Sequence, residues 1–146
     1  AAKAVCLKLA QAGATVTVCN RTLDKAEAIC AHDPARLRPA GFDGATLYKE
    51  AQSCDLLVNC TSLGMEGTAG QFADFSFLDG LNSGVPVVDL IYAPAQTELL
   101  RQAARRGHKT VNGYGLLVNQ AVLALEHFTG TAIDAARMKQ ALSGLV

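Results

Sequence analysis

The chain has 146 residues, of which 50% are hydrophobic and 18% are charged, a composition that indicates a folded globular protein and excludes an intrinsically disordered one. Its 13 basic and 13 acidic residues give a formal net charge of zero. This balance argues against a nucleic-acid or membrane-surface partner, because both usually require an excess of basic residues. The length suits one hydrophobic core, so we expect a single domain over residues 1–146.

The five cysteines show neither a CxxC nor a CxxH spacing, which argues against a disulfide framework and against a zinc site. We therefore expect no bound metal and free thiols in a reducing, cytoplasmic setting. The chain contains no run of 18 or more apolar residues, so we expect no transmembrane helix.

Helices and strands are predicted to alternate along the chain. The first half is expected to form a helix over residues 1–12, a strand over 14–19, a helix over 22–31 capped by Thr22, a short strand within 33–46, a helix near 48–52 and a strand over 56–60. The second half is expected to form a turn or short helix near 75–81, a strand over 85–92, a helix over 97–106 capped by Thr97, a strand over 109–112, and helices over 115–128 and 134–143.

Alternation of this kind, with strands that are continuous apolar runs, indicates a parallel sheet covered by helices on both faces. Right-handed crossovers then favour an α/β fold with a three-layer, doubly wound, Rossmann-like sheet. Such folds open with a strand and a glycine-rich turn, whereas this chain begins with a predicted helix. We expect the first strand and the glycine-rich turn to be lacking here and to lie upstream of Ala1 in a longer protein. The alternative is a smaller α/β sheet that begins with a helix.

The segment after the strand at 14–19 indicates an anion site. Ligands of open parallel sheets bind at the carboxyl ends of the strands, where NAD-binding domains place an acidic residue on the ribose 2′-hydroxyl. This chain has Asn20, Arg21 and Thr22 at that place, with Lys25 one helical turn later. A guanidinium can bind a phosphate through two parallel hydrogen bonds, so the segment favours NADP over NAD. The alternative is a solvated arginine in a loop.

Polar residues elsewhere are ambiguous when taken alone. Thr61 to Met65 reads as a polar loop with a turn glycine, Tyr92 as an aromatic residue at a strand end, and Gln120 as a polar residue on an apolar helix. The residues by themselves therefore predict a parallel α/β domain that binds an anionic ligand.

Four segments in this order and spacing together resemble the C-terminal, NADP-binding domain of the shikimate dehydrogenase family. They are CNRT at 19–22 with Ala26 and Glu27, LVNCTSLGM at 57–65, VDLIYAP at 88–94 and NGYGLLVNQA at 112–121. The resemblance implies an oxidoreductase of the shikimate pathway, which serves chorismate and aromatic amino-acid biosynthesis. The reaction that it implies is the reversible, NADPH-dependent reduction of 3-dehydroshikimate to shikimate.

The resemblance also implies roles for individual residues. The cofactor-binding residues would be Asn20, Arg21, Thr22 and Lys25 at the adenosine 2′-phosphate, Thr61, Ser62, Leu63, Gly64 and Met65 along the nicotinamide half, the carbonyl of Gly113 at the carboxamide, and Leu116 where the family usually has methionine. Tyr92 and Gln120 would bind the substrate, shikimate or 3-dehydroshikimate, across a cleft with an N-terminal domain. Asn112 replaces the family's common aspartate.

The family's catalytic lysine and aspartate belong to that N-terminal domain, which we expect to be absent from this chain. We therefore expect no catalytic residue here and no activity of the chain alone. Two alternatives remain. One is an NAD-using quinate/shikimate dehydrogenase, although such enzymes tend to carry an acidic residue near Asn20 and Arg21. The other is a non-catalytic nucleotide-binding paralogue that kept the fold.

Overall fold

The computed structural model of the chain describes residues 1–142. Helices and strands alternate, and every strand pair among these residues is parallel. The elements in chain order are α1 (Ala2–Gln11), β1 (Val16–Cys19), α2 (Leu23–Cys30), β2 (Leu37–Ala40), α3 (Gly44–Ala51), β3 (Leu57–Asn59), the 3₁₀ helix η1 (Ser76–Gly80), β4 (Val87–Asp89), α4 (Glu98–Arg105), β5 (Thr110–Val111), α5 (Tyr114–Thr129) and α6 (Ala135–Leu142). The predicted α/β architecture is confirmed. Ser143, the last residue of the predicted final helix, lies outside the described residues.

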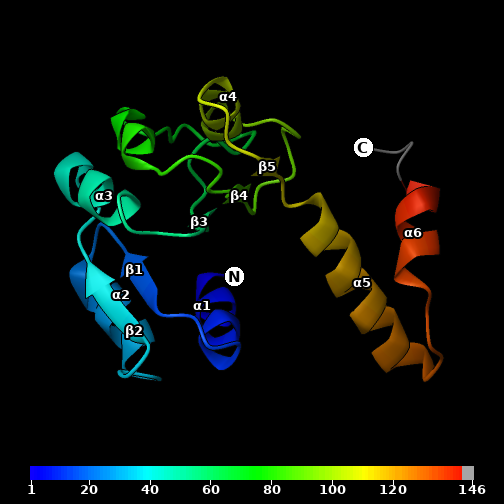
Figure 1. The fold of residues 1–146 in the computed structure, drawn as a ribbon. Helices are drawn as coiled ribbons and strands as arrows, with labels where there is room; N and C mark the ends of the chain where they lie inside the picture. The colour runs from blue at the N-terminus through cyan, green and yellow to red at the C-terminus, as the bar shows by residue number, and fades with distance from the viewer. Residues whose placement is uncertain (143–146) are drawn as a thin grey trace.

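The described strands form two parallel sheets (Figure 1). β1 pairs with β2, with Val16 beside Leu37, and β3, β4 and β5 form the second sheet in that order. A Rossmann sheet has the order 3-2-1-4-5-6. The two sheets correspond to strands 3-2 and 4-5-6 of that order, with the central strand not supplied by the described residues.

Two clusters of buried side chains hold the helices against these sheets. One lies between β1, β2, α1 and α2, and the larger one joins α3, η1, β4 and α4. Their members are Cys6, Ala10, Val18, Ala26, Cys30 and Leu37 in the first, and Ala51, Phe77, Leu78, Leu81, Val85, Val87, Leu99, Leu100 and Ala103 in the second. Helix α5 leads away from β5, and α6 packs along α5 (Figure 1).

Capping explains where two helices begin. The Asp43 carboxylate accepts a hydrogen bond from the Thr46 N–H at 2.9 Å, so α3 starts at Gly44, well before the helix expected near Tyr48. Thr97 caps α4 as predicted, because its hydroxyl oxygen accepts from the Leu100 N–H at 3.4 Å.

The side-chain cap predicted for Thr22 is wrong. Thr22 is the residue before α2, yet its hydroxyl group makes no capping hydrogen bond. Its backbone N–H instead donates to Oδ1 of Asn20 at 2.9 Å. The competing interaction is a local asparagine turn, which satisfies the backbone two residues further along the chain.

Within residues 1–142, none of the helices combines the length and the apolar character that crossing a membrane requires.

Candidate functional site

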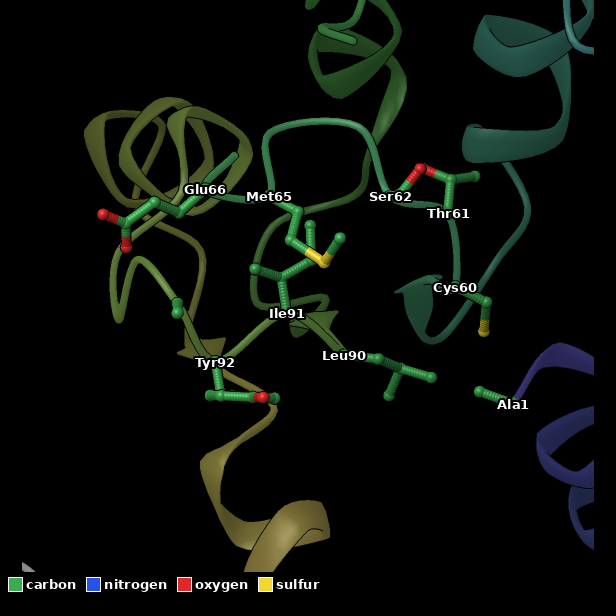
Figure 2. Close-up of a pocket in the computed structure, with 10 residues that line it drawn as sticks. Ala1, Cys60, Thr61, Ser62, Met65, Glu66, Leu90, Ile91 and Tyr92 are labelled. Carbon is green, nitrogen blue, oxygen red and sulfur yellow. The ribbon is translucent and has the colours of Figure 1, made fainter. Parts of the chain in front are cut away.

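The segments that follow β3 and β4 line an open cavity of about 480 Å³. Figure 2 shows its lining, which comes from the loop after β3, the segment after β4 and the first residue of the chain. The lining residues are Ala1, Cys60, Thr61, Ser62, Met65, Glu66, Leu90, Ile91, Tyr92 and Ala93. The cavity thus lies at the carboxyl ends of two parallel strands, where such sheets bind their ligands.

A buried polar network adjoins the residues that line this cavity, because Asn59 and Asp89 directly precede the lining residues Cys60 and Leu90. Nδ2 of Asn59, at the end of β3, donates to Oδ1 of Asp89 at 3.0 Å, and Asp89 lies at the end of the neighbouring strand β4. The hydroxyl of Thr97 donates to Oδ2 of Asp89 at 2.6 Å. All three side chains are almost completely buried. The network therefore joins the ends of β3 and β4 to the start of α4.

The same network reaches the loop after β3. Oδ1 of Asn59 accepts from the Thr61 N–H at 3.0 Å and from the Thr61 hydroxyl at 2.7 Å. The Glu66 N–H then donates to the carbonyl of Ala93 at 3.0 Å, which ties the far end of the loop to the segment after β4. Gly64 has a φ of +90°, a conformation that side chains other than glycine rarely adopt. The loop is thus held at both ends around a glycine turn.

Gly113 brings the start of α5 against the end of β4. Its N–H donates to the carbonyl of Ile91 at 2.9 Å, and a Cβ on Gly113 would lie 1.9 Å from the carbonyl oxygen of Leu90. The carbonyl of Gly113 accepts the first helical bond, from the Leu117 N–H at 3.0 Å. Glycine is required here by the close approach of two backbones.

Asn112 supports the same junction. Its Nδ2 donates to the carbonyl of Ala95 at 2.9 Å, and its Oδ1 accepts from the Tyr114 N–H at 3.3 Å. An amide both donates and accepts, so Asn112 fills a structural role that an ionised aspartate could fill only in part.

Arg21 extends from the end of β1 into solvent. It makes no hydrogen bond and no ion pair with any of residues 1–142. Arg38, on the neighbouring strand, is by contrast bound to Glu50. Lys25 is also exposed, and Asp24 lies in the first turn of α2. The guanidinium of Arg21 is thus free to bind an anion beside the N-terminus of α2.

The structure brings only some of the predicted site residues together. Thr61, Ser62, Met65 and Tyr92 line the cavity, and Tyr92 is 43% exposed. The remaining predicted residues do not line it: Leu63 and Gly64 lie in the loop after β3, Gly113 before α5, Leu116 and Gln120 on an exposed part of α5, and Asn20, Arg21, Thr22 and Lys25 after β1.

Three residues of the network, Asn59, Asp89 and Thr97, were missed as site residues. Two of them had a visible signal, because Asn59 and Asp89 are polar residues at the ends of strands that are otherwise apolar. A polar side chain at such a buried place needs a partner. Their pairing could not be seen, because they are 30 residues apart in the chain.

The buried thiols of Cys19 and Cys60, at the ends of two strands, make the free energy of unfolding depend on pH in the alkaline range. Burial raises the pKa of Cys19 and of Cys60 from 9.0 to about 11. In this range the folded protein keeps protons that the unfolded chain releases, so the free energy of unfolding should fall as pH rises from 9 towards about 11. Urea unfolding across this range measures the slope. A Cys19→Ala, Cys60→Ala double variant should make the slope shallower without abolishing it, because burial also raises the pKa of Cys6, Cys30 and Cys54. An equally steep slope would contradict the assignment.

Residues 1–142 contain no group of three or more histidine, cysteine, aspartate or glutamate side chains placed to hold a metal ion.

Comparison with known proteins gives concordant results. A family model described as "Shikimate 5'-dehydrogenase C-terminal domain" matches residues 113–142. The shikimate dehydrogenase (NADP(+)) of Alkaliphilus oremlandii is 39% identical over 153 residues, which cover 97% of this chain and 51% of that protein.

Solved structures agree with the sequence relatives. Shikimate 5-dehydrogenase from Thermus thermophilus, in complex with NADP(H) and shikimate, superposes with a TM-score of 0.79 at 31% identity, covering 98% of this chain and 51% of that one. Quinate dehydrogenase from Corynebacterium glutamicum, in complex with NAD, also has a TM-score of 0.79, at 28% identity, with coverage of 97% and 51%. The Rossmann-like assignment is thereby confirmed.

The chain spans about half the length of the curated relatives that it matches. The agreement of the family model, the sequence relatives and the superposed structures shows that the chain belongs to the shikimate dehydrogenase family.

Proposed function

We propose that this chain is the NADP-binding part of a shikimate dehydrogenase, which interconverts shikimate and 3-dehydroshikimate. The observation that carries the cofactor assignment is the unpaired, exposed Arg21 at the end of β1. No acidic residue stands among Asn20, Arg21 and Thr22 to accept a hydrogen bond from a ribose 2′-hydroxyl or to repel a 2′-phosphate. Arg21 binds the phosphate, and Lys25 adds positive charge one helical turn away.

We place the nicotinamide end of the cofactor in the cavity. Thr61, Ser62 and Met65 line the same cavity as Tyr92, so a nicotinamide held by the loop after β3 lies beside a substrate held by the segment after β4. Bound NADP supplies the hydride chemistry there. The protein supplies binding and orientation, and the carbonyl of Gly113 accepts from the carboxamide in addition to the Leu117 N–H.

The exposed face of α5 fits a site completed by a second domain. Leu116 is 43% exposed and Gln120 is exposed, and we place Leu116 against the nicotinamide and Gln120 against the substrate in a cleft. The catalytic pair and most of the substrate shell then belong to that second domain, consistent with relatives of about twice this length.

A quinate dehydrogenase that uses NAD is the second candidate. It is favoured by the superposition on a quinate dehydrogenase in complex with NAD, with a TM-score of 0.79. The positive charge of Arg21 and Lys25 at the end of β1 disfavours it, since NAD carries no 2′-phosphate there.

Cofactor titration tests the proposal. The 146-residue chain should bind NADP more tightly than NAD in a calorimetric or fluorescence titration, and alone it should not oxidise shikimate. Equal binding of both cofactors would favour the quinate enzyme. Binding of neither would contradict the proposed cofactor role, and turnover by the isolated chain would refute the division of labour between two domains.

A further inference from the structure

We propose that Asn59 is a positioning residue: the buried carboxylate of Asp89 orients it, and it in turn sets the shape of the loop over residues 61–66 that lines the cavity. The inference rests on the proposed function only for the identity of the ligand. The device itself is a chain of hydrogen bonds that runs from the interior to the wall of the cavity.

The series of hydrogen bonds begins at Asp89, which is 0% exposed. Its Oδ1 accepts from Nδ2 of Asn59 at 3.0 Å and from the Ile91 N–H at 3.1 Å, and its Oδ2 accepts from the Thr97 hydroxyl at 2.6 Å. The three ion pairs among residues 1–142 do not involve it. The Ile91 N–H can only donate, so Oδ1 of Asp89 is an acceptor, and Asn59 must turn a donor towards the same oxygen.

This requirement decides how the Asn59 amide is turned. Its NH₂ group must face Asp89, so its oxygen must face Thr61. The Asn59 oxygen then accepts both the Thr61 N–H at 3.0 Å and the Thr61 hydroxyl at 2.7 Å. In a flipped amide, the NH₂ group of Asn59 would face the Thr61 N–H, so that two donors would point at each other with no acceptor between them. Burial makes such a mismatch costly.

The direction of hydrogen-bond donation is also fixed within the loop. Because the Thr61 hydroxyl proton is donated to Asn59, its oxygen is left to accept, and it accepts from the Leu63 N–H at 3.1 Å. The turn is completed by the Met65 N–H, which donates to the carbonyl of Ser62 at 3.1 Å. The buried carboxyl group of Asp89 thus determines the direction of each bond as far as the backbone of Leu63.

This arrangement separates the roles of two adjacent hydroxyls that both line the cavity. The proton of Thr61 is committed to Asn59, so Thr61 cannot donate it to a ligand. The Ser62 hydroxyl is exposed and makes no hydrogen bond with the described part of the chain. Ser62 is therefore the hydroxyl that the loop presents to the ligand, and Thr61 shapes the turn that presents it.

Hydrogen–deuterium exchange of the ligand-free protein tests the device. In Asn59→Asp, residue 59 still accepts from Thr61 but turns a second carboxylate towards Asp89. Protection of the Thr61 and Leu63 amides should fall about tenfold. The double variant Asn59→Asp, Asp89→Asn places a donor opposite an acceptor again, but its NH₂ group also faces the Ile91 N–H, so it should recover only part of the lost protection. A double variant no better protected than Asn59→Asp would overturn the proposal.

Thr97→Val is the matched control, because it removes another donor to the same carboxylate. It should lower the melting temperature without exposing the Thr61 and Leu63 amides beyond that global loss. If Asn59→Asp fails to fold, Thr61→Val removes the oxygen that accepts from Leu63, and the Leu63 amide should still exchange about tenfold faster. Unchanged exchange in Thr61→Val would overturn the proposal.

An NADP titration of the same variants provides the functional readout. The Asn59→Asp variant should bind NADP more weakly than Thr97→Val does at matched stability, with rescue in the double variant. Failure of the wild-type protein to bind NADP would refute the proposed function alone, because the exchange experiment needs no ligand. Rescue of exchange without rescue of binding would refute the link between loop shape and the ligand.

Discussion

Replacing Arg21 by alanine should weaken NADP binding about tenfold to a hundredfold while NAD binding barely changes. A hydrogen bond to a charged group contributes about 1.5–3 kcal/mol, and tenfold in affinity corresponds to about 1.4 kcal/mol. Arg21 is exposed and has no ion pair among residues 1–142, so its removal breaks no ion pair in the described part of the chain. Calorimetric titration with both cofactors measures the effect directly.

Two further variants show whether the effect belongs to the guanidinium. Arg105→Ala removes the same charge from the exposed last turn of α4 and should change the affinity for either cofactor less than about twofold, since exposed charges at a distance are screened. Arg21→Lys keeps the charge but loses the paired hydrogen bonds, and its NADP affinity should fall between those of the wild type and Arg21→Ala. If Arg21→Ala weakened the binding of NAD and NADP equally, Arg21 would bind a phosphate group that both cofactors have.

Gly113→Ala should destabilise the protein by about 3 kcal/mol or more, since the added Cβ would lie 1.9 Å from the Leu90 carbonyl oxygen and 2.4 Å from its carbon. The cost is mainly steric, because Gly113 has a φ of −74° and a ψ of −3°, and a negative φ of this size does not itself require glycine. The end of β4 and the start of α5 would have to move apart. Urea unfolding monitored by circular dichroism measures the loss.

Gly115→Ala is the matched control two residues further along α5. A Cβ there meets nothing within 4 Å, and alanine is favoured over glycine in a helix by about 0.5–1 kcal/mol. The two substitutions add the same methyl group and should change stability in opposite directions. A Gly113→Ala variant as stable as the wild type would show that the junction between β4 and α5 is easily deformed.

Most of the fold was predictable because its signals are local. The β-branched run at 14–19, the continuous apolar runs at 56–60 and 85–92 and the capping residue Thr97 placed the strands and α4 within a few residues. The prediction was less accurate where two local signals competed. At Asp43 a cap began α3 early, and at Thr22 the asparagine turn of Asn20 took the place of a side-chain cap.

The candidate site was predictable only in part, because its geometry depends on distant partners. Arg21 could be placed at a strand end from the order of elements alone, and its exposure agrees with that placement. The sequence shows that Asn59 and Asp89 are polar residues at the ends of apolar strands, but the hydrogen bond between them joins residues 30 positions apart. No periodicity in the sequence reports such a pairing.

By itself the sequence determined the alternation of helices and strands, the parallel character of the sheets and the basic segment after β1. These follow from side-chain period, capping and turn chemistry, which act over a few residues. Only the tertiary structure decided that the loops after β3 and β4 share one cavity, that Asp89 orients Asn59 and through it Thr61, and that Gly113 is required by the Leu90 backbone. Those features arise from contacts between strand ends that the chain brings together only when the sheet forms.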